Sequence, residues 1–213
     1  MNLPTCRPLN KTLLFLLLQL VLATGVASAQ EKLPSEKVQK AVRLITAAVS
    51  DLKDPQIKLD LDSPKSTGIK GSNNIGLIAI PDKQLTADAL AKVGTNLVPV
   101  GQLWLRGIAM YSKGEILRGD KLRNVTVRDN DKEARLQLYL LGARRSDQGM
   151  ELVIFAMDKK PLLVVSLEPA ESAGEFPIEV TGKGEKGKKD SAMLIVNLVG
   201  KYRASISIRE LKD

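Results

Sequence analysis

The chain offers few side chains that could carry out catalysis near neutral pH. It contains no histidine, and its single cysteine, Cys6, precedes an apolar run at the amino terminus. Histidine is the most common general acid or base, and cysteine is a frequent nucleophile and metal ligand. An enzyme built from the rest of the chain would have to use carboxylates, lysine, tyrosine or serine. We therefore expect no cofactor and no metal site.

The run Gly182-Lys183-Gly184-Glu185-Lys186-Gly187 has the glycine spacing of a dinucleotide-binding loop. That chemistry needs a helix directly after the loop to receive the pyrophosphate. Here the chain continues into another strand pattern, which predicts a solvated hairpin loop instead. Four lysines of this loop form the candidate contact for an anionic partner: Lys183, Lys186, Lys188 and Lys189.

Two short motifs resemble parts of the active site of penicillin-recognising enzymes. Ser50-Asp51-Leu52-Lys53 has the serine and lysine spacing, and Ser72-Asn73-Asn74 is similar to the second motif. In those enzymes the serine begins a buried helix and a Lys-Thr-Gly strand faces it. Ser50 instead falls in the last turn of a predicted helix, and the chain has no Lys-Thr-Gly. An ordinary helix end is the better interpretation.

Acidic residues occur at spacings that could hold calcium. Asp129-Asn130-Asp131-Lys132-Glu133 lacks the glycine and the bidentate glutamate of a calcium loop, so it predicts a polar turn. Asp60 and Asp62 are expected on one face of a strand end. Asn124-Val125-Thr126 is a glycosylation sequon, which matters only in a eukaryotic secretory pathway.

The amino terminus predicts export. Arg7 and Lys11 precede an apolar run from Leu13 to Ala23, and Ala27-Ser28-Ala29 forms a cleavage site before Gln30. Residues 1–29 are therefore expected to be a secretory signal peptide. The run is about half the ~20 residues that cross a bilayer, so the mature protein is expected to be soluble, with an uncleaved anchor as the alternative.

The charge of the mature chain is moderate. The full chain has 32 Lys and Arg against 24 Asp and Glu, and residues 1–29 contain two basic residues and no acidic ones, which leaves +6. This excess favours anionic partners but lacks the clustering that indicates nucleic acid. Six aromatic residues beyond residue 29 are too few for sugar or single-strand stacking platforms: Trp104, Tyr111, Tyr139, Phe155, Phe176 and Tyr202.

Helical periodicity appears twice. Apolar residues at three- and four-residue spacing from Val38 to Leu52 predict a one-sided helix, with Ser35 as N-cap and Asp54-Pro55 as its end. This helix is expected to pack on a larger body, with a membrane-surface helix as the alternative. A short second helix is expected from Thr86 to Val93, with Thr86 as N-cap and Gly94 as the stop.

Strand patterns fill most of the remaining chain, and the short connections between them favour antiparallel hairpins. In the last strand Ala204, Ile206 and Ile208 share a core face. Leu162 to Val165 and Leu194 to Val196 are apolar on both faces, which predicts central strands. The expected strands are 57–61, 75–80, 97–105, 122–128, 134–143, 150–157, 162–167, 176–181, 192–198 and 202–208.

These patterns predict a mainly β (α+β) fold, with an antiparallel sandwich-like C-terminal half, an amphipathic N-terminal helix and a short second helix. We expect one β-rich domain over residues 30–213, with the segment 112–120 as the alternative boundary between two units. Without cysteine after residue 29, stability must come from burial and not from disulfides.

The function expected from these features is a soluble, exported binding or structural module, periplasmic or extracellular. Its partner would be an anionic envelope polymer or another envelope protein, and not nucleic acid. The alternative is a hydrolase that acts on an envelope polymer through two carboxylates about 5–10 Å apart across a cleft.

Overall fold

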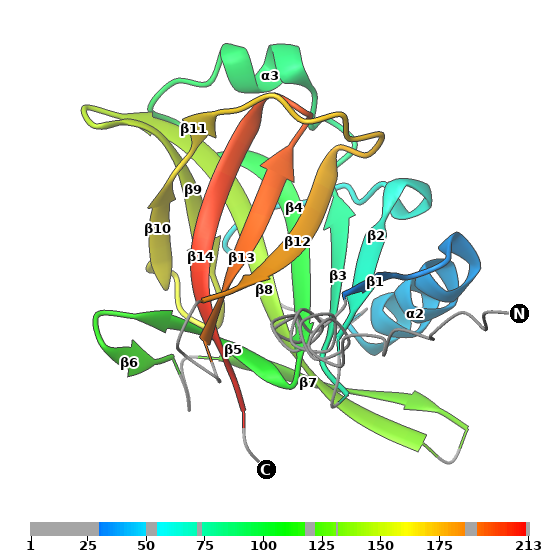
Figure 1. Ribbon diagram of the computed structural model, residues 1–213. Helices are drawn as coiled ribbons and strands as arrows, with labels where there is room; N and C mark the ends of the chain where they lie inside the picture. Colours follow the sequence, from blue (N-terminus) through cyan, green and yellow to red (C-terminus); the bar gives the residue numbers. More distant parts are fainter. Residues whose placement is uncertain are drawn as a thin grey trace, which may run out of the picture.

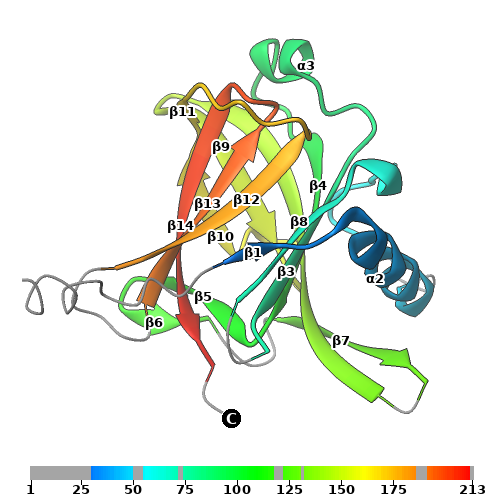
Figure 2. The ribbon, with the colours of Figure 1, turned by 45° about the vertical axis from the view of Figure 1, so that its right-hand side comes forward.

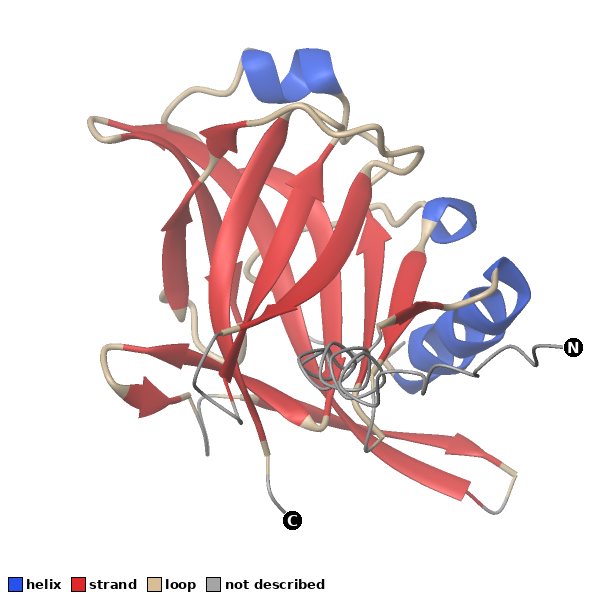
Figure 3. Cartoon of the chain, in the orientation of Figure 1, coloured by secondary structure: helices blue, strands red, loops and turns tan. Residues whose placement is uncertain are grey.

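The computed structural model describes residues 30–49, 55–71, 74–117, 122–130, 132–185 and 191–211. Residues 1–29, which the sequence predicts to be a signal peptide, and the motif residues Ser50, Lys53, Ser72, Asn73 and Asp131 lie outside these ranges. The described chain is mainly β, with antiparallel sheets and two α-helices arranged as a sandwich (Figures 1 and 3). The fold class predicted from the sequence is confirmed.

The first sheet has eight strands in the order β1-β2-β3-β4-β8-β9-β10, and β7 also pairs with β8. The long strand β8 is central, because its first half pairs with β7, its second half with β9 and its other edge with β4. The bounds are β1 Glu31–Lys32, β2 Thr67–Lys70, β3 Gly76–Pro81, β4 Val98–Arg106, β7 Arg123–Asp129, β8 Lys132–Ser146, β9 Gly149–Phe155 and β10 Leu163–Ser166.

The second sheet has six strands in the order β12-β13-β14-β5-β6, and β11 pairs with β14. It faces the first sheet across the main core (Figure 2). The bounds are β5 Ile108–Ser112, β6 Glu115–Ile116, β11 Glu168–Pro169, β12 Ile178–Gly184, β13 Ser191–Leu198 and β14 Tyr202–Glu210.

A second core lies on the opposite face of the first sheet, under the helix α2 (Ser35–Ala48). The helix buries Val38, Val42 and Ile45, which follow the predicted apolar face. They pack in a cluster that includes Trp104 and Leu138 of the sheet. Lys40 of the helix also pairs with Asp129 of β7, Nζ to Oδ2 at 2.6 Å. The first sheet is therefore covered on both faces.

Because both faces of the first sheet are buried, some polar side chains lie in the interior. Neighbouring residues on the same strand form hydrogen bonds with them. On the helix side, Trp104 Nε1 donates to Gln102 Oε1 at 3.0 Å. On the side of the main core, the Tyr139 hydroxyl donates to Gln137 Oε1 at 2.7 Å. Both pairs join residues i and i+2 of one strand, whose side chains share a face.

A bulge fits β4 against its neighbours. The register between β4 and β8 shifts between Pro99 and Gly101, and Gly101 has φ of 152°. A Cβ at this position would overlap the carbonyl oxygen of Ile80 on β3. Only glycine fits this backbone and this close approach.

The edges of the two sheets lie beside each other at two places, which we call seams. At one, β12 lies against β2 and β3, and the Thr67 hydroxyl donates to the Ile178 carbonyl across the gap at 2.9 Å. At the other, β10 lies near β14, and the chain crosses between sheets through Leu167 into β11. The second seam is thus closed at the β11 end.

Four expectations about local structure were wrong. The helix α2 ends at Ala48, with Val49 as its C-cap, and not at Asp54-Pro55. Residues 57–61 form no strand, because only Leu61 bridges to Asp82 while the rest of the segment lacks a ladder partner. The N-cap of α2 is Pro34, whose extended ψ of 142° precedes the first helical residue Ser35. Leu163–Ser166 is an edge strand, and its alternation of half-buried and exposed residues reflects coverage of one face alone.

The remaining elements were predicted closely. The helix α3 spans Ala87–Ala91, and the Thr86 side chain caps it by accepting from Ala89 N–H at 3.1 Å. Ala204, Ile206 and Ile208 are buried, as the alternation predicts. The strands β1, β2, β5, β6 and β11 were not predicted.

Both sheets take strands from either side of the segment 112–120. In the first sheet β4 pairs with β8, and in the second β5 pairs with β14. Ser112 itself belongs to the β5–β6 hairpin, in which it pairs with Glu115. Each sheet thus contains strands from both sides of this segment, and the single domain stays a prediction.

Tyr139 makes the free energy of unfolding depend on pH in the alkaline range. Burial raises the pKa of its phenol above the ordinary value of 10.0, so the unfolded chain loses this proton first as pH rises. The stability from the neutral phenol is complete below about pH 10 and falls above it, by up to about 1.4 kcal/mol per pH unit. Tyr139→Phe should cost about 1–3 kcal/mol at pH 7, because Gln137 loses its donor.

Denaturant unfolding at pH 7, 10 and 11 measures both effects. The variant should lose less stability than the parent chain between pH 10 and 11. Equal alkaline slopes in the two proteins would show that Tyr139 is not buried as described.

Candidate functional site

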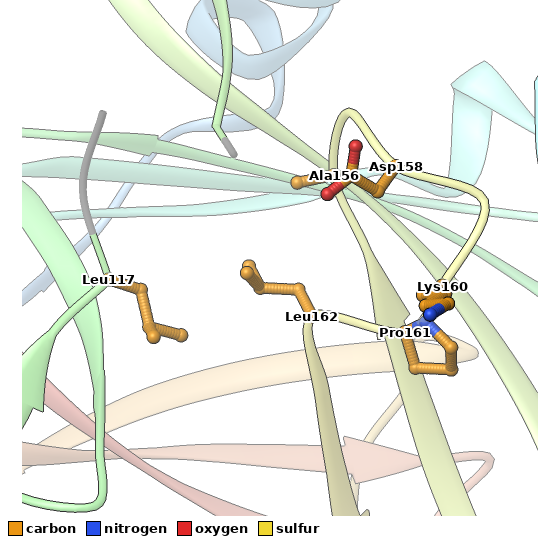
Figure 4. A pocket seen from close by; sticks show the side chains of 6 residues that line it. All are labelled: Leu117, Ala156, Asp158, Lys160, Pro161 and Leu162. Atoms are coloured by element: carbon orange, nitrogen blue, oxygen red, sulfur yellow. The ribbon is translucent and has the colours of Figure 1, made fainter. Parts of the chain in front are cut away.

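A pocket of about 180 Å³ opens at the β10 seam, at the end opposite β11 (Figure 4). The loop 156–162, which joins β9 to β10, forms one wall, and Leu117, which follows β6, forms the other. The lining residues are Leu117, Ala156, Asp158, Lys160, Pro161 and Leu162. The pocket therefore lies between the edge strands of the two sheets.

Backbone bonds fix the two ends of this pocket. The Leu162 N–H donates to the Ile154 carbonyl at 2.8 Å, and the Leu117 N–H donates to the Met110 carbonyl at 2.9 Å. Two side chains hold the start of the loop: Gln56 Nε2 donates to the Met157 carbonyl at 2.8 Å, and Arg123 Nε donates to the Ala156 carbonyl at 3.4 Å. Partial burial lowers the pKa of Arg123 from its usual value.

The pocket has an apolar floor and a charged rim. Ala156 is buried, and Leu117 and Leu162 pack against the main core while half-exposed. Asp158 and Lys160 are exposed at the rim. This arrangement can hold an aliphatic group and can orient a charged group beside it.

Exposed apolar side chains gather on the same part of the chain. Among the described residues, the large hydrophobic side chains that remain exposed are Met157, at 48%, and Val164, at 37%. Met157 belongs to the pocket loop, and Val164 lies on the adjoining edge strand β10. Val164 pairs with Val153 of the core under α2, so its side chain lies on the opposite face of the first sheet from the main core that the pocket adjoins.

The pocket does not hold the facing pair of carboxylates that a glycosidase requires. The pocket contains one carboxylate, Asp158. Elsewhere, Asp60 Oδ1 forms an ion pair with Lys83 Nζ at 2.9 Å, and Asp62 Oδ2 forms one with Lys65 Nζ at 2.8 Å. Because residues 57–61 form no strand, the expected strand-end face of Asp60 and Asp62 does not exist.

Structural hydrogen bonds also occupy the buried Asp82. Its carboxylate accepts from the Asp60 N–H at 2.7 Å and from the Gln84 N–H at 2.9 Å. Nearby, the hydrogen bond that the exposed Lys83 donates to the Asp60 carboxylate raises the pKa of this lysine. No group of three or more metal-ligating side chains occurs within the described residues.

Glu151 on β9 has a displaced pKa, in the direction that opposes acid catalysis. The hydrogen bond from Arg144, followed by that from Ser146, lowers the pKa of its carboxyl below the ordinary 4.5. The Arg144 Nε to Glu151 Oε2 distance is 2.8 Å, and the Glu151 side chain is 15% exposed. A general acid needs the opposite shift, so Glu151 is a structural ion-pair partner.

The candidate anion contact is described only in part. Lys183 is exposed near the end of β12, and Lys186, Lys188 and Lys189 lie outside the described residues. The flanking segments pair as β12 and β13, which confirms a hairpin and excludes the helix that a dinucleotide site needs. Whether these lysines act together stays a prediction.

The other residues singled out in the sequence occupy ordinary structural positions. Asn124 is exposed on β7, with Thr126 on the same face. Asp129 and Asn130 lie at the β7–β8 turn, where Asn130 has φ of 54°. Trp104, Tyr139 and Phe155 are buried core residues.

Comparison with known proteins found no matching family model, no matching curated protein and no matching solved structure. Within the described ranges, neither α-helix has the length and apolar character that a membrane span requires. The function therefore has to be argued from the geometry of the chain.

Sequence reasoning missed the pocket. Its two walls are about forty residues apart in the chain. In addition, the sequence Asp158-Lys159-Lys160-Pro161 predicts only an ordinary turn. The available signal was an apolar pair, Leu162 and Leu163, directly after a charged turn.

The Arg144–Glu151 pair gives a prediction with a defined sign. Because the folded-state pKa of Glu151 is lowered, its ionised form stabilises the protein above about pH 4.5, and this contribution is lost as pH falls. Glu151→Gln should therefore cost up to about 1 kcal/mol at pH 7 and little at pH 3.

Glu133→Gln is the matched control, since Glu133 pairs with Arg128 across a neighbouring hairpin with both side chains more than half exposed. It should change stability less at either pH. Urea unfolding of both variants measures the difference. An effect of Glu151→Gln that is the same at pH 3 and pH 7 would contradict the assignment.

Proposed function

We propose that this chain is an exported β-rich binding module of the cell envelope or extracellular space. It holds an aliphatic group of a partner protein in the pocket between Leu117 and the loop 156–162. The observation that carries the proposal is the apolar floor of this pocket, formed by Leu117, Ala156 and Leu162, with the exposed Met157 in the same loop.

The size of the pocket indicates what it accepts. Sites that enclose a whole small molecule usually measure about 300–1,000 Å³, whereas this one measures about 180 Å³. It fits one aliphatic side chain or the end of a short acyl group. The rest of the partner would lie on the surrounding surface, over Met157 and the edge strand β10.

The charges at the rim indicate what lies beside that group. Lys159 and Lys160 face solvent next to the single carboxylate Asp158. The excess of one positive charge favours a partner that carries a carboxylate near its aliphatic group. Another exported protein with an acidic and aliphatic segment meets both requirements.

Export is the part of this proposal that rests on the sequence alone. Arg7, Lys11 and the Ala27-Ser28-Ala29 site support it. The anionic polymer remains a second class of partner, with Lys183 and the lysines that follow it as the contact.

An NMR titration tests the pocket with hexanoate, which combines an aliphatic chain and a carboxylate. Hexanoate should bind weakly and shift the methyl signals of Leu117, Ala156 and Leu162. Hexylammonium, with the same chain and the opposite charge, should bind more weakly. Methyl signals in the second core, such as Val42, should not move.

Charge reversal separates the two candidate contacts. Lys160→Glu should weaken hexanoate binding about two- to fivefold, as the removal of one exposed charge interaction implies, and should favour hexylammonium. Lys183→Glu is the matched control and should leave hexanoate binding unchanged. Loss of binding with Lys183→Glu alone, or no shift at the pocket methyls, would refute the proposed site.

A further inference from the structure

Gln30, the first described residue, bridges the two sheets at the β12 seam. Its side-chain Oε1 accepts a hydrogen bond from the Gly182 N–H on β12 at 2.6 Å. The next residues, Glu31 and Lys32, form β1 and pair with Lys70 and Ile69 of β2. Figure 2 shows β1 extending from α2 past β2 toward β12. Gln30 is therefore held to one sheet by its side chain and to the other by its neighbours.

The backbone of β12 is arranged to receive this side chain. The Val199 N–H donates to the Pro177 carbonyl and the Glu185 N–H to the Ser191 carbonyl, so the odd-numbered residues of β12 bond to β13. In an antiparallel ladder the residues between them point their N–H groups away. The N–H groups of Gly182 and Gly184 thus face the open edge.

Gly182 also provides the space that the carboxamide occupies. A Cβ at this position would overlap Gln30 Nε2. Gly184, two residues further on, has nothing within 4 Å of the place where its Cβ would lie. The contact with Gln30 is therefore specific to Gly182.

We propose that Gln30 is a modification site, at which the mature chain begins with a pyroglutamyl ring docked on Gly182. The inference rests on the cleavage before Gln30 that the proposed export requires. Cleavage frees the Gln30 nitrogen as an amine, which attacks its own Cδ. The N–Cδ bond forms, the Cδ–Nε2 bond breaks, and Nε2 leaves as ammonia with the proton that the amine gives up.

The described contacts favour this reaction and its product. The Gly182 N–H donates to Oε1, the oxygen on which negative charge develops when Cδ is attacked, as a donor of an oxyanion hole does. Oε1 stays on Cδ as the ring carbonyl, so the ring retains the acceptor for this N–H. Nε2, the atom that occupies the space beside Gly182, is the one that leaves.

The ring changes the charge of the mature protein as well as its mass. A free α-amine has an ordinary pKa of about 7.7–8.0. The chain has no histidine, and its one cysteine lies before residue 30. Apart from that amine, the mature chain holds no group whose ordinary pKa lies between about 5 and 9.5. A chain closed by the ring should show no titration step near pH 8.

Intact mass and proton titration of the exported protein test the inference together. The mature chain should weigh about 17 Da less than the sequence from Gln30 onward, the mass of one ammonia molecule. Its titration should show no group near pH 8. A mature chain that keeps the full mass from Gln30, or that begins at another residue, overturns the inference.

Glycine-to-proline variants test the contact with Gly182 as a whole, because proline at this position removes the N–H donor and its Cβ also overlaps the place of Gln30 Nε2. Proline is tolerated where a strand N–H faces an open edge, so Gly182→Pro removes the donor and Gly184→Pro is the matched control. After cleavage of a fusion directly before Gln30, ring closure should be about two- to tenfold slower in Gly182→Pro, the rate factor of one net hydrogen bond.

Equal rates in Gly182→Pro and Gly184→Pro would refute the contribution of the Gly182 contact. This experiment does not depend on export and uses residues 30–213, which contain every described strand and both cores. A failure to cyclise leaves the hexanoate titration unaffected. The failure of this inference and that of the binding proposal are thus distinguishable.

Discussion

Burial of both faces of the first sheet is the constraint on which the rest of the structure depends. The chain has one cysteine, so it forms no internal disulfide, and its stability has to come from apolar contacts. Strands β4, β8 and β9 supply residues to the main core on one face and to the core under α2 on the other. The N-terminal helix is therefore part of the stabilising structure.

The first sheet is no longer covered on both faces at the two seams, where it meets the edges of the second sheet. One seam is closed by the Thr67–Ile178 and Gln30–Gly182 hydrogen bonds. The other is closed by β11 at one end and opens at the pocket at the other end. The exposed Met157 lies in the loop that forms one wall of that opening. The two seams thus differ in how they are closed.

Local chemistry made much of the fold predictable. The three- and four-residue spacing of Val38, Val42 and Ile45 reports the buried face of α2 directly, and Thr86 reports the start of α3. Strand positions follow from alternation, because side chains on successive residues point to opposite faces. The hairpin geometry follows from short connections rich in turn residues.

Features that depend on distant partners were not predictable. Leu163 to Val165 are apolar enough for a central strand, yet their position at the edge is set by the crossing into β11. Residues 57–61 have strand composition but find a partner only at Leu61. The pocket was missed for the same reason, because Leu117 and Leu162 become neighbours only through the pairing of the sheets.

The central claim is that the first sheet, although buried on both faces, opens locally at its β10 edge. Native-state hydrogen exchange tests this claim most directly. Amides of Leu103 and Leu141, on the strands covered on both faces, should exchange only through global unfolding. Amides of β6, β10 and the loop 156–162 should exchange through local opening at a lower free energy. Exchange from β10 that is as slow as from β8, or exchange from β8 before β10, would contradict the account.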